Sequence, residues 1–288
     1  GIESKLVANG AMVQSILVEN DGEEEAIEGF GTDRDATKLS KEEIRKIVKD
    51  AGIVGLGGAG FPTHVKLTPK DENAIDYVIV NGAECEPYLT SDYRTMTEMV
   101  KDEPKITVCP LLTKYPQGGE RSIIYAVTGR KVNSSMLPAD AGCIVDNIDT
   151  VASIYNAVCK TTPLIRKIIT VTGDAIAEPQ NFEVRLGTNY QRLVEAAGGF
   201  KQEPAKIISG GPMMGAPMSW EAAMNASVTK TTSGILVLPE DGAIDRRRKT
   251  QLNHMLNRAK AACIQCTFCT QLCPRHMLGH PLQPHRIM

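Results

Sequence analysis

The chain has 288 residues, which is enough for about two domains of roughly 150 residues each. Apolar residues make up 42% and charged residues 23%, a balance that excludes a wholly disordered protein. The net charge is −2 and no basic stripe is present, so we expect no nucleic-acid partner. No run approaches the ~18 apolar residues of a membrane span and no signal peptide opens the chain, so we expect no direct membrane span.

The N-terminal part is predicted to hold a hairpin, a linker and a helix. Residues 5–20 read as two short strands around an Asn-Gly turn. The polar stretch 21–38 is predicted to be a linker. Ser40 and Glu43 then have the spacing of a capping box, which predicts a helix that ends at Gly52.

Strands and helices alternate in the next part of the chain. Short apolar runs predict strands at Tyr77–Val80, Ile106–Val108 and Cys143–Val145. Helical patterns follow at Arg121–Val127 and from Ile148 to Val158. This alternation indicates an α/β sheet, in which ligands bind beyond the carboxyl ends of the strands.

The pattern changes near residue 166. Strands are predicted at 167–173, 182–184, 206–209 and 234–238, with a helix that Thr188 and Gln191 cap and that ends at Gly198. A hairpin, one helix and a returning strand favour a small β-grasp-like module. Thr250–Ala262 is predicted to be a helix that leads into a cluster of cysteines.

Four of the eight cysteines form one run with the spacing C-x2-C-x2-C-x3-C-P: Cys263, Cys266, Cys269 and Cys273. Bacterial ferredoxins bind [4Fe–4S] clusters with this spacing, and the fourth cysteine of such a run serves the other cluster of a two-cluster protein. Structural zinc sites use two C-x2-C pairs well apart in sequence, so zinc is the less favoured metal. We expect the natural protein to continue beyond Met288 to a second run; the alternative is one cluster that uses Cys273 itself.

A glycine-rich loop precedes the α/β part. Gly55, Gly57 and Gly60 fit G-x-G-x-x-G, with Gly58 as a fourth glycine, but a helix comes before the loop and Phe-Pro-Thr after it. The strand–loop–helix context of a dinucleotide fingerprint is therefore missing. Two interpretations remain: a loop whose backbone N–H groups approach a phosphate with Lys66 nearby, or a flexible connector.

Several polar and glycine-rich motifs follow one another along the chain: GLGGAGFPT at 55–63 with Lys66, NGAECEP at 81–87, KYPQGGE at 114–120, LPAD at 137–140, DNIDT at 146–150, KIISGGPMM at 206–214 and TTSGILVL at 231–238. Taken together, they resemble the RnfC family, which is itself similar to the FMN- and NADH-binding flavoprotein subunit of respiratory complex I. The end of the chain, Cys263–His285, looks closest to the cobalamin reductase of propanediol-utilisation microcompartments. The resemblance covers nearly the whole chain.

The resemblance implies an α/β fold class with three parts: a Rossmann-like FMN/NADH-binding domain, a β-grasp (soluble-ligand-binding) module and a helical ferredoxin-like Fe–S segment. It implies that the glycine loop and Lys66 hold the FMN phosphate and NADH. Asn81 and Glu84 would contact the flavin, and Glu86 would lie near the nicotinamide. Glu120 and Asn147 would complete the cleft. The implied cofactors are FMN, NADH and a [4Fe–4S] cluster.

The sequence departs from the family pattern at one internal place. The family has a further β-α unit before the strand expected at Ile106, and only Thr95–Lys105 spans that interval here. We expect a missing or trimmed unit to affect NADH affinity more than the fold. The expected organisation is 1–24, the remnant of an N-terminal barrel-sandwich module; 40–160, the FMN/NADH-binding domain; 165–240, the β-grasp module; and 250–288, a truncated Fe–S segment.

The leading hypothesis is an NADH-dependent oxidoreductase that moves electrons through FMN to [4Fe–4S] and on to an electron-acceptor protein. That partner would be a cobalamin-dependent system, another reductase or the subunits of an Rnf-type membrane complex. The rival hypotheses are a non-enzymatic Fe–S adaptor that has lost flavin and a zinc-stabilised scaffold. A large chain with clustered thiols is expected in the cytoplasm, at the inner face of the membrane or in a microcompartment.

Some polar and sulfur-containing residues are expected to have no cofactor role. We interpret His276, His280 and His285 as parts of a packed or solvated connector. Met213, Met214 and Met218 are predicted to fill core or interface space. Nothing near Cys85 in the sequence lowers its pKa, so a redox role for that thiol is not favoured.

Overall fold

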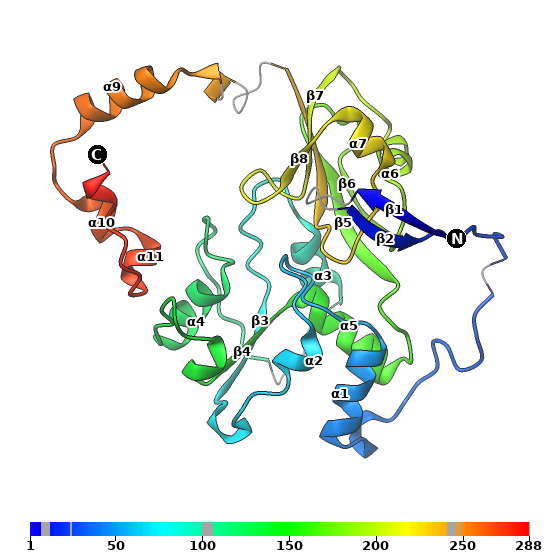
Figure 1. Cartoon of the computed structure of the whole chain (residues 1–288). Helices are drawn as coiled ribbons and strands as arrows, with labels where there is room; N and C mark the ends of the chain where they lie inside the picture. The colour runs from blue at the N-terminus through cyan, green and yellow to red at the C-terminus, as the bar shows by residue number, and fades with distance from the viewer. Residues whose placement is uncertain (7–11, 24, 100–105, 241–245, 248, 288) are drawn as a thin grey trace.

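The structure is a computed structural model that describes all residues except 7–11, 24, 100–105, 241–245, 248 and 288. It is a mixed α/β protein, and its described strands form three separate sheets (Figure 1). Short 3₁₀ turns lie at Ala36–Lys38, Glu72–Ala74, Pro138–Ala141 and Pro284–Arg286. None of the helices in the described ranges is long and apolar enough to cross a bilayer.

The N-terminal part contains the hairpin and the helix that the sequence predicts. Strands β1 (Ile2–Leu6) and β2 (Met12–Ile16) pair antiparallel, and the expected Asn-Gly turn lies outside the described residues. Helix α1 (Lys41–Asp50) begins after Ser40, and the reciprocal hydrogen bonds of the capping box with Glu43 are both present. The capping pattern therefore places this helix correctly, because it satisfies backbone N–H groups that the first turn leaves free.

A small parallel sheet forms the centre of the α/β part. Strand β3 (Tyr77–Asn81) pairs with β4 (Cys143–Asn147), and β4 leads directly into α5 (Ile148–Cys159). Helix α4 (Glu120–Thr128) covers one face of the sheet, where Ile123 and Ile124 pack with Ile79 of β3. The short helices α2 (Thr63–Lys66) and α3 (Ser91–Met99) complete this part.

The strand predicted at Ile106–Val108 is not formed. These residues pair with no strand that the structure describes, and Val108 is 81% exposed. A strand needs a neighbour that completes its backbone hydrogen bonds, and an apolar run alone does not supply one. Val78 of β3 is itself 72% exposed, so β3 is open to solvent at this position, whereas its neighbour Ile144 in β4 is 8% exposed.

The β-grasp module contains a five-stranded sheet in the order β6-β5-β9-β7-β8. Its core surrounds Tyr190, which is fully buried and whose hydroxyl lies 2.7 Å from Ser209 Oγ. The cap of its first helix differs from our prediction, because Asn189 and not Thr188 accepts the hydrogen bond from Gln191 N. The elements are β5 (Arg166–Thr172), β6 (Gln180–Arg185), α6 (Tyr190–Ala196), β7 (Pro204–Ser209), β8 (Ala216–Met218), α7 (Trp220–Asn225) and β9 (Gly234–Pro239).

Gly173, at the end of β5, provides a sharp test of this packing. Its φ is +119°, and a Cβ there would lie 2.0 Å from the carbonyl oxygen of Val237 in β9. We expect Gly173→Ala to lower the free energy of unfolding by about 3–5 kcal/mol, since backbone strain and a clash act together. Urea denaturation measures this loss. Gly187→Ala is the matched control, because Gly187 also has positive φ (+92°) but open space around it, and should cost only about 1 kcal/mol.

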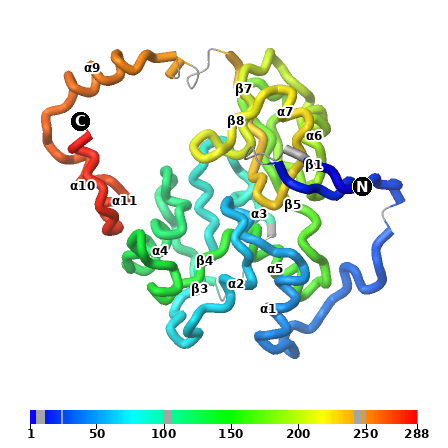
Figure 2. The backbone as a smooth tube through the Cα atoms, viewed as in Figure 1, coloured from blue at the N-terminus to red at the C-terminus, as the bar shows by residue number. Residues whose placement is uncertain are grey.

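The C-terminal segment lies apart from the two modules along most of its length. Helix α9 (Leu252–Ala262) has no buried residue, and the short helices α10 (Phe268–Gln271) and α11 (Pro274–Met277) follow it. Figure 2 shows this segment as an arm that leaves the β-grasp module and returns toward α4. The cysteine run, residues 263–273, lies in the part of this arm that follows α9.

Candidate functional site

The glycine loop is closed by its own backbone. Gly55 N donates to Phe61 O at 2.8 Å, and Gly60 N donates to Gly55 O at 3.2 Å. Leu56 N donates to Thr150 Oγ1 at 3.0 Å, which fixes the loop to the first turn of α5. The loop therefore lies at the carboxyl end of β4, where ligands bind in parallel sheets.

Gly57 is the point at which the loop approaches the sheet most closely. A Cβ on Gly57 would lie 3.1 Å from the Cβ of Asn147, so a side chain there would push the loop away. Gly58 (φ +148°) and Gly60 (φ +65°) adopt backbone conformations that favour glycine. These features indicate a loop of defined shape rather than a flexible connector.

Lys66 and Glu120, which the resemblance places in one cleft, contact each other directly. Lys66 Nζ donates to Val145 O at 2.6 Å and to Glu120 Oε1 at 3.1 Å, and Asp146 Oδ1 lies 3.5 Å away. Asp146 is only 5% exposed and its Oδ1 has no hydrogen-bond partner. Burial raises the pKa of Asp146, and the nearby ammonium of Lys66 opposes that shift. The lysine is thus a cation held at the end of β4 by two carboxylates.

Asn81 and Asn147 stand opposite each other at the ends of β3 and β4. Asn81 donates to Gly118 O at 3.0 Å and accepts from Ala83 N. Asn147 donates to Asp92 Oδ2 at 2.7 Å and caps α5 by accepting from Asp149 N. Both ends of each amide are engaged within the protein, so these side chains shape the cleft walls.

Glu84 and Glu86 diverge, although they are two residues apart. Glu84 accepts hydrogen bonds from Ser91 Oγ and from the backbone N–H groups of Asp92 and Tyr93, and so caps α3. Glu86 accepts from Met213 N at 3.0 Å and from Met214 N at 2.7 Å, in the loop between β7 and β8. Glu86 therefore ties the α/β part to the β-grasp module, a contact that the sequence did not predict.

The prediction of core space is wrong for the side chains of Met213 and Met214, while a place at an interface with a partner stays a prediction. Met214 is 78% exposed and Met213 53% exposed; only their backbone N–H groups are engaged, with Glu86. The physical reason is the close approach of this loop to Glu86, where a Cβ on Gly211 would meet the carboxylate at 2.4 Å. Met218 does pack against the β-grasp core, as predicted.

A buried group of charges that the sequence analysis missed lies behind the glycine loop. Lys167 of β5 is 5% exposed, and its Nζ donates to Leu56 O at 2.9 Å and to Lys230 O at 3.0 Å. Burial lowers the pKa of Lys167 and raises the pKa of Asp149. Burial, with Glu84 nearby, raises the pKa of Asp92 to about 7. The only sign of this buried group in the sequence was Lys167, a lysine within a largely apolar strand.

Asp92→Asn tests this group through the pH dependence of stability. The folded protein holds a proton on Asp92 that the unfolded chain releases between about pH 4 and pH 7, so the free energy of unfolding falls as pH rises through that window. The variant cannot ionise and keeps an acceptor for Asn147. Urea denaturation should show it more stable than wild type by about 4 kcal/mol at pH 8 and equal at pH 4. Asp174→Asn, at an exposed position, should change neither value; a parallel pH profile for wild type and Asp92→Asn would contradict the argument.

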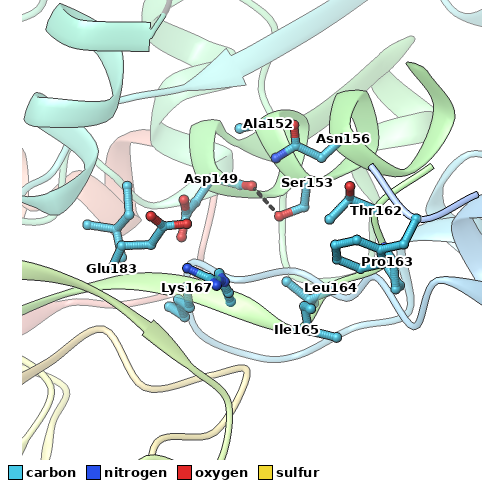
Figure 3. Close-up of a pocket in the computed structure, with 13 residues that line it drawn as sticks. Asp149, Ala152, Ser153, Asn156, Thr162, Pro163, Leu164, Ile165, Lys167 and Glu183 are labelled. Carbon is cyan, nitrogen blue, oxygen red and sulfur yellow. Dashed lines mark hydrogen bonds between the residues drawn. The ribbon is translucent and has the colours of Figure 1, made fainter. Parts of the chain in front are cut away.

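A hollow of about 250 Å³ lies between α5 and the start of β5 (Figure 3). Asp149 and Lys167 lie near each other at one end of it and Pro163 at the other. None of the predicted FMN or NADH residues lines this hollow. The candidate cofactor site therefore remains at the strand ends and the glycine loop.

The cysteine run supplies four thiols in eleven residues, and none of them forms a disulfide. Gln265 and Thr267 between them have positive φ (56° and 65°), so the backbone turns sharply within the run. Within the described ranges, no three His, Cys, Asp or Glu side chains come close enough together to hold a metal ion. The donor set, four thiols without a carboxylate, fits an iron–sulfur cluster.

Family models match three successive parts of the chain. The Nuo51 FMN-binding domain matches residues 48–102 and 95–156, the SLBB domain matches 168–217, and the 4Fe-4S dicluster domain matches 262–288. Fold and site together thus define a protein of the class that combines an FMN-binding domain, a β-grasp module and a 4Fe–4S domain.

Relatives narrow this class to one family. The chain is 40% identical to a subunit of the proton-translocating ferredoxin:NAD(+) oxidoreductase complex of Clostridium ljungdahlii, over 92% of this chain and 63% of that protein. It is 38% identical to the corresponding subunit of the Na(+)-translocating complex of Acetobacterium woodii (96% and 68%) and 35% identical to the cobalamin reductase PduS of Salmonella typhimurium (87% and 62%). The chain belongs to this family, the RnfC family, and spans about two thirds of the length of these relatives.

Solved structures agree on the fold. Two structures of an NAD+-reducing [NiFe]-hydrogenase, in the H2-reduced and air-oxidized states, match with TM-scores of 0.53 and 0.55 at 17% and 18% identity. They cover 71% and 73% of this chain, and 47% and 48% of theirs. At this identity the likeness concerns the fold alone.

The FMN-domain match also bears on the short interval before Ile106. The family model matches in two parts, and residues 95–102 belong to both. The expected loss of a β-α unit falls in the interval where these two matches meet, and it stays a prediction.

Proposed function

We propose that this chain takes electrons from NADH by way of bound FMN and passes them through [4Fe–4S] to an acceptor protein. FMN, when bound, accepts two electrons and a proton as hydride from NADH, which becomes NAD+, and can give the electrons up singly. The observation that carries this proposal is Lys66, held with the glycine loop at the carboxyl end of the parallel strands. A cation beside a glycine loop at that place suits the phosphate of a flavin nucleotide.

The proposal assigns residues as follows. Lys66 and the loop of Gly55, Gly57, Gly58 and Gly60 bind phosphate, while Asn81, Asn147 and Glu120 keep the cleft open and oriented. Glu84 acts by capping α3, and Glu86 by holding the β-grasp loop against the nicotinamide side. The residues proposed to bind the cluster are Cys263, Cys266, Cys269 and Cys273. The proposed division into 1–24, 40–160, 165–240 and 250–288 separates these tasks.

The proposed partners follow the relatives. One relative is named a cobalamin reductase, and others are subunits of ion-translocating ferredoxin:NAD(+) oxidoreductase complexes. We propose a cytoplasmic protein whose acceptor is a cobalamin-dependent system, another reductase or an Rnf-type membrane complex. A pull-down from a cobalamin-producing host, with and without the membrane fraction, separates these destinations.

An anaerobic absorbance spectrum before and after addition of NADH tests the proposal. Flavin bands on a broad iron–sulfur absorbance, both bleached by NADH, are the expected result. A brown protein without releasable flavin and without response to NADH would replace this proposal with the Fe–S adaptor. The exposure of Val78 in β3 and the lack of a described partner strand for residues 106–108 are the observations that favour that rival.

A zinc scaffold is the remaining alternative. It predicts a colourless protein with stoichiometric zinc and no iron. Metal analysis of the same sample decides this, because the four thiols of the cysteine run can bind either metal.

A further inference from the structure

We propose that the first turn of α4, with Asn133 beside it, is the docking surface that holds the cluster-binding arm against the flavin domain, and that Arg121 and His280 are its positioning residues. The inference rests on the proposed function for its consequence, electron transfer between the two cofactors. The docking itself stands on contacts within this chain.

One large apolar side chain of the arm, that of Leu278, is buried. Leu278 is 3% exposed, whereas the other large apolar side chains of the run and the residues after it are at least 46% exposed. The next residue, Gly279, lies beside Asn133: a Cβ on Gly279 would be 3.8 Å from the Cβ of Asn133. The arm is thus anchored just after α11, and only that short helix separates the last cysteine of the run from Leu278.

A polar contact between the arm and α4 adjoins this buried residue. Arg121 Nη1 lies 3.4 Å from His280 Nε2, and Arg121 Nη2 donates to Met136 O at 3.3 Å. The guanidinium can only donate, so His280 accepts through Nε2. One arginine therefore joins the arm to the loop that carries Asn133 and Met136.

The same turn of α4 reaches the proposed flavin site. Glu120, the residue before Arg121, pairs with Lys66 at 3.1 Å. Two successive residues thus contact the proposed phosphate-binding lysine and the cluster-binding arm. Because α4 packs rigidly on the small sheet through Ile123 and Ile124, a shift of the arm relative to this helix changes its distance from the flavin site.

The rest of the arm gives little support of its own. Helix α9 has no buried residue along its length. Figure 1 shows it reaching away from both modules before the chain returns to α4. The position of the cysteine run therefore depends on the anchor at Leu278–His280.

Hydrogen exchange of the oxidised protein tests the docking without NADH. In His280→Ala, we expect exchange of residues 274–287 and 133–137 to accelerate about five- to tenfold, because a hydrogen bond to a charged group is lost. Arg121→Ala should do the same but also frees Met136 O, so His280→Ala is the cleaner variant. His280→Gln keeps an acceptor and should restore most of the protection. His254→Ala, on exposed α9, is the matched control and should not change it.

Stopped-flow mixing with NADH then tests the positioning role. We expect unchanged bleaching of the flavin and about tenfold slower bleaching of the cluster in His280→Ala, with rescue by His280→Gln. Unchanged exchange in both variants would overturn the docking. Faster exchange with unaltered cluster bleaching would overturn the positioning role. A wild-type protein that NADH does not reduce would refute the proposed function, while the exchange result would still decide the docking.

Discussion

Replacing Cys266 with serine is expected to abolish iron–sulfur absorbance and to remove most of the bound iron. Cys266 lies in the middle of the run, exposed and free of any disulfide, and the cluster needs its thiolate as a ligand. Serine has nearly the same size but is a much poorer ligand for iron. Iron and sulfide analysis with an anaerobic spectrum measures the loss. Flavin content should stay at the wild-type value, because the glycine loop and Lys66 belong to a different part of the chain.

Two further cysteine variants make this result specific. Cys109→Ser removes another exposed thiol outside the run and should leave iron unchanged. Cys273→Ser separates the two interpretations of the fourth cysteine: full loss of iron means that it ligates the same cluster, and retained iron means that it serves a second one. Retained iron in Cys266→Ser, or zinc in place of iron in the wild type, would contradict the iron–sulfur assignment.

Local signals in the sequence predicted most of the fold. The capping box at Ser40 and the alternation of strands and helices depend on neighbouring residues, and both are confirmed. The hairpin, helix and returning strands of the β-grasp module were likewise visible as apolar runs between turn residues. The strand at Ile106–Val108 failed because pairing depends on a distant neighbour, which an apolar run cannot reveal.

The candidate site was predictable in its residue types but not in its contacts. The resemblance placed Lys66 and Glu120 in one cleft, but not their direct ion pair, which joins the end of α2 to the start of α4. The contact of Glu86 with the backbone of Met213 and Met214 joins segments about 127 residues apart, so no local pattern encodes it. Lys167 escaped notice for the same reason, because its partners Leu56 O and Lys230 O are backbone atoms of other loops.

Because of these non-local contacts, the α/β part and the β-grasp module both contribute to the proposed cleft. Two hydrogen bonds fix the glycine loop: Leu56 N donates to Thr150 of α5, and Lys167 of the β-grasp module donates to Leu56 O. Glu86 holds the loop after β7 over the neighbouring strand end. The β-grasp module therefore acts as one wall of the proposed flavin site. Substitutions in this module should alter flavin binding even where the sequence of the glycine loop is unchanged.

Replacing Lys66 with alanine should weaken FMN binding about tenfold to a hundredfold. A charge-assisted contact to phosphate contributes roughly 1.5–3 kcal/mol, and every 1.4 kcal/mol is tenfold in affinity. Titration of the flavin-depleted protein with FMN, followed by quenching of flavin fluorescence, measures the change. Lys66→Arg keeps the positive charge and should retain most of the affinity, and Lys70→Ala, at a nearby exposed position, should leave it unchanged.

The same variant should also be less stable, and this effect must be separated from binding. Removing the ammonium leaves the buried carboxylate of Asp146 without its cation, which should lower the free energy of unfolding by about 1–3 kcal/mol. Adding Asp146→Asn to Lys66→Ala removes the unpaired charge and should restore most of the stability. It should not restore the affinity for FMN, because the phosphate still lacks its cation. Recovery of both properties in the double variant would mean that Lys66 only maintains the fold, and would move the proposed phosphate site away from the end of β4.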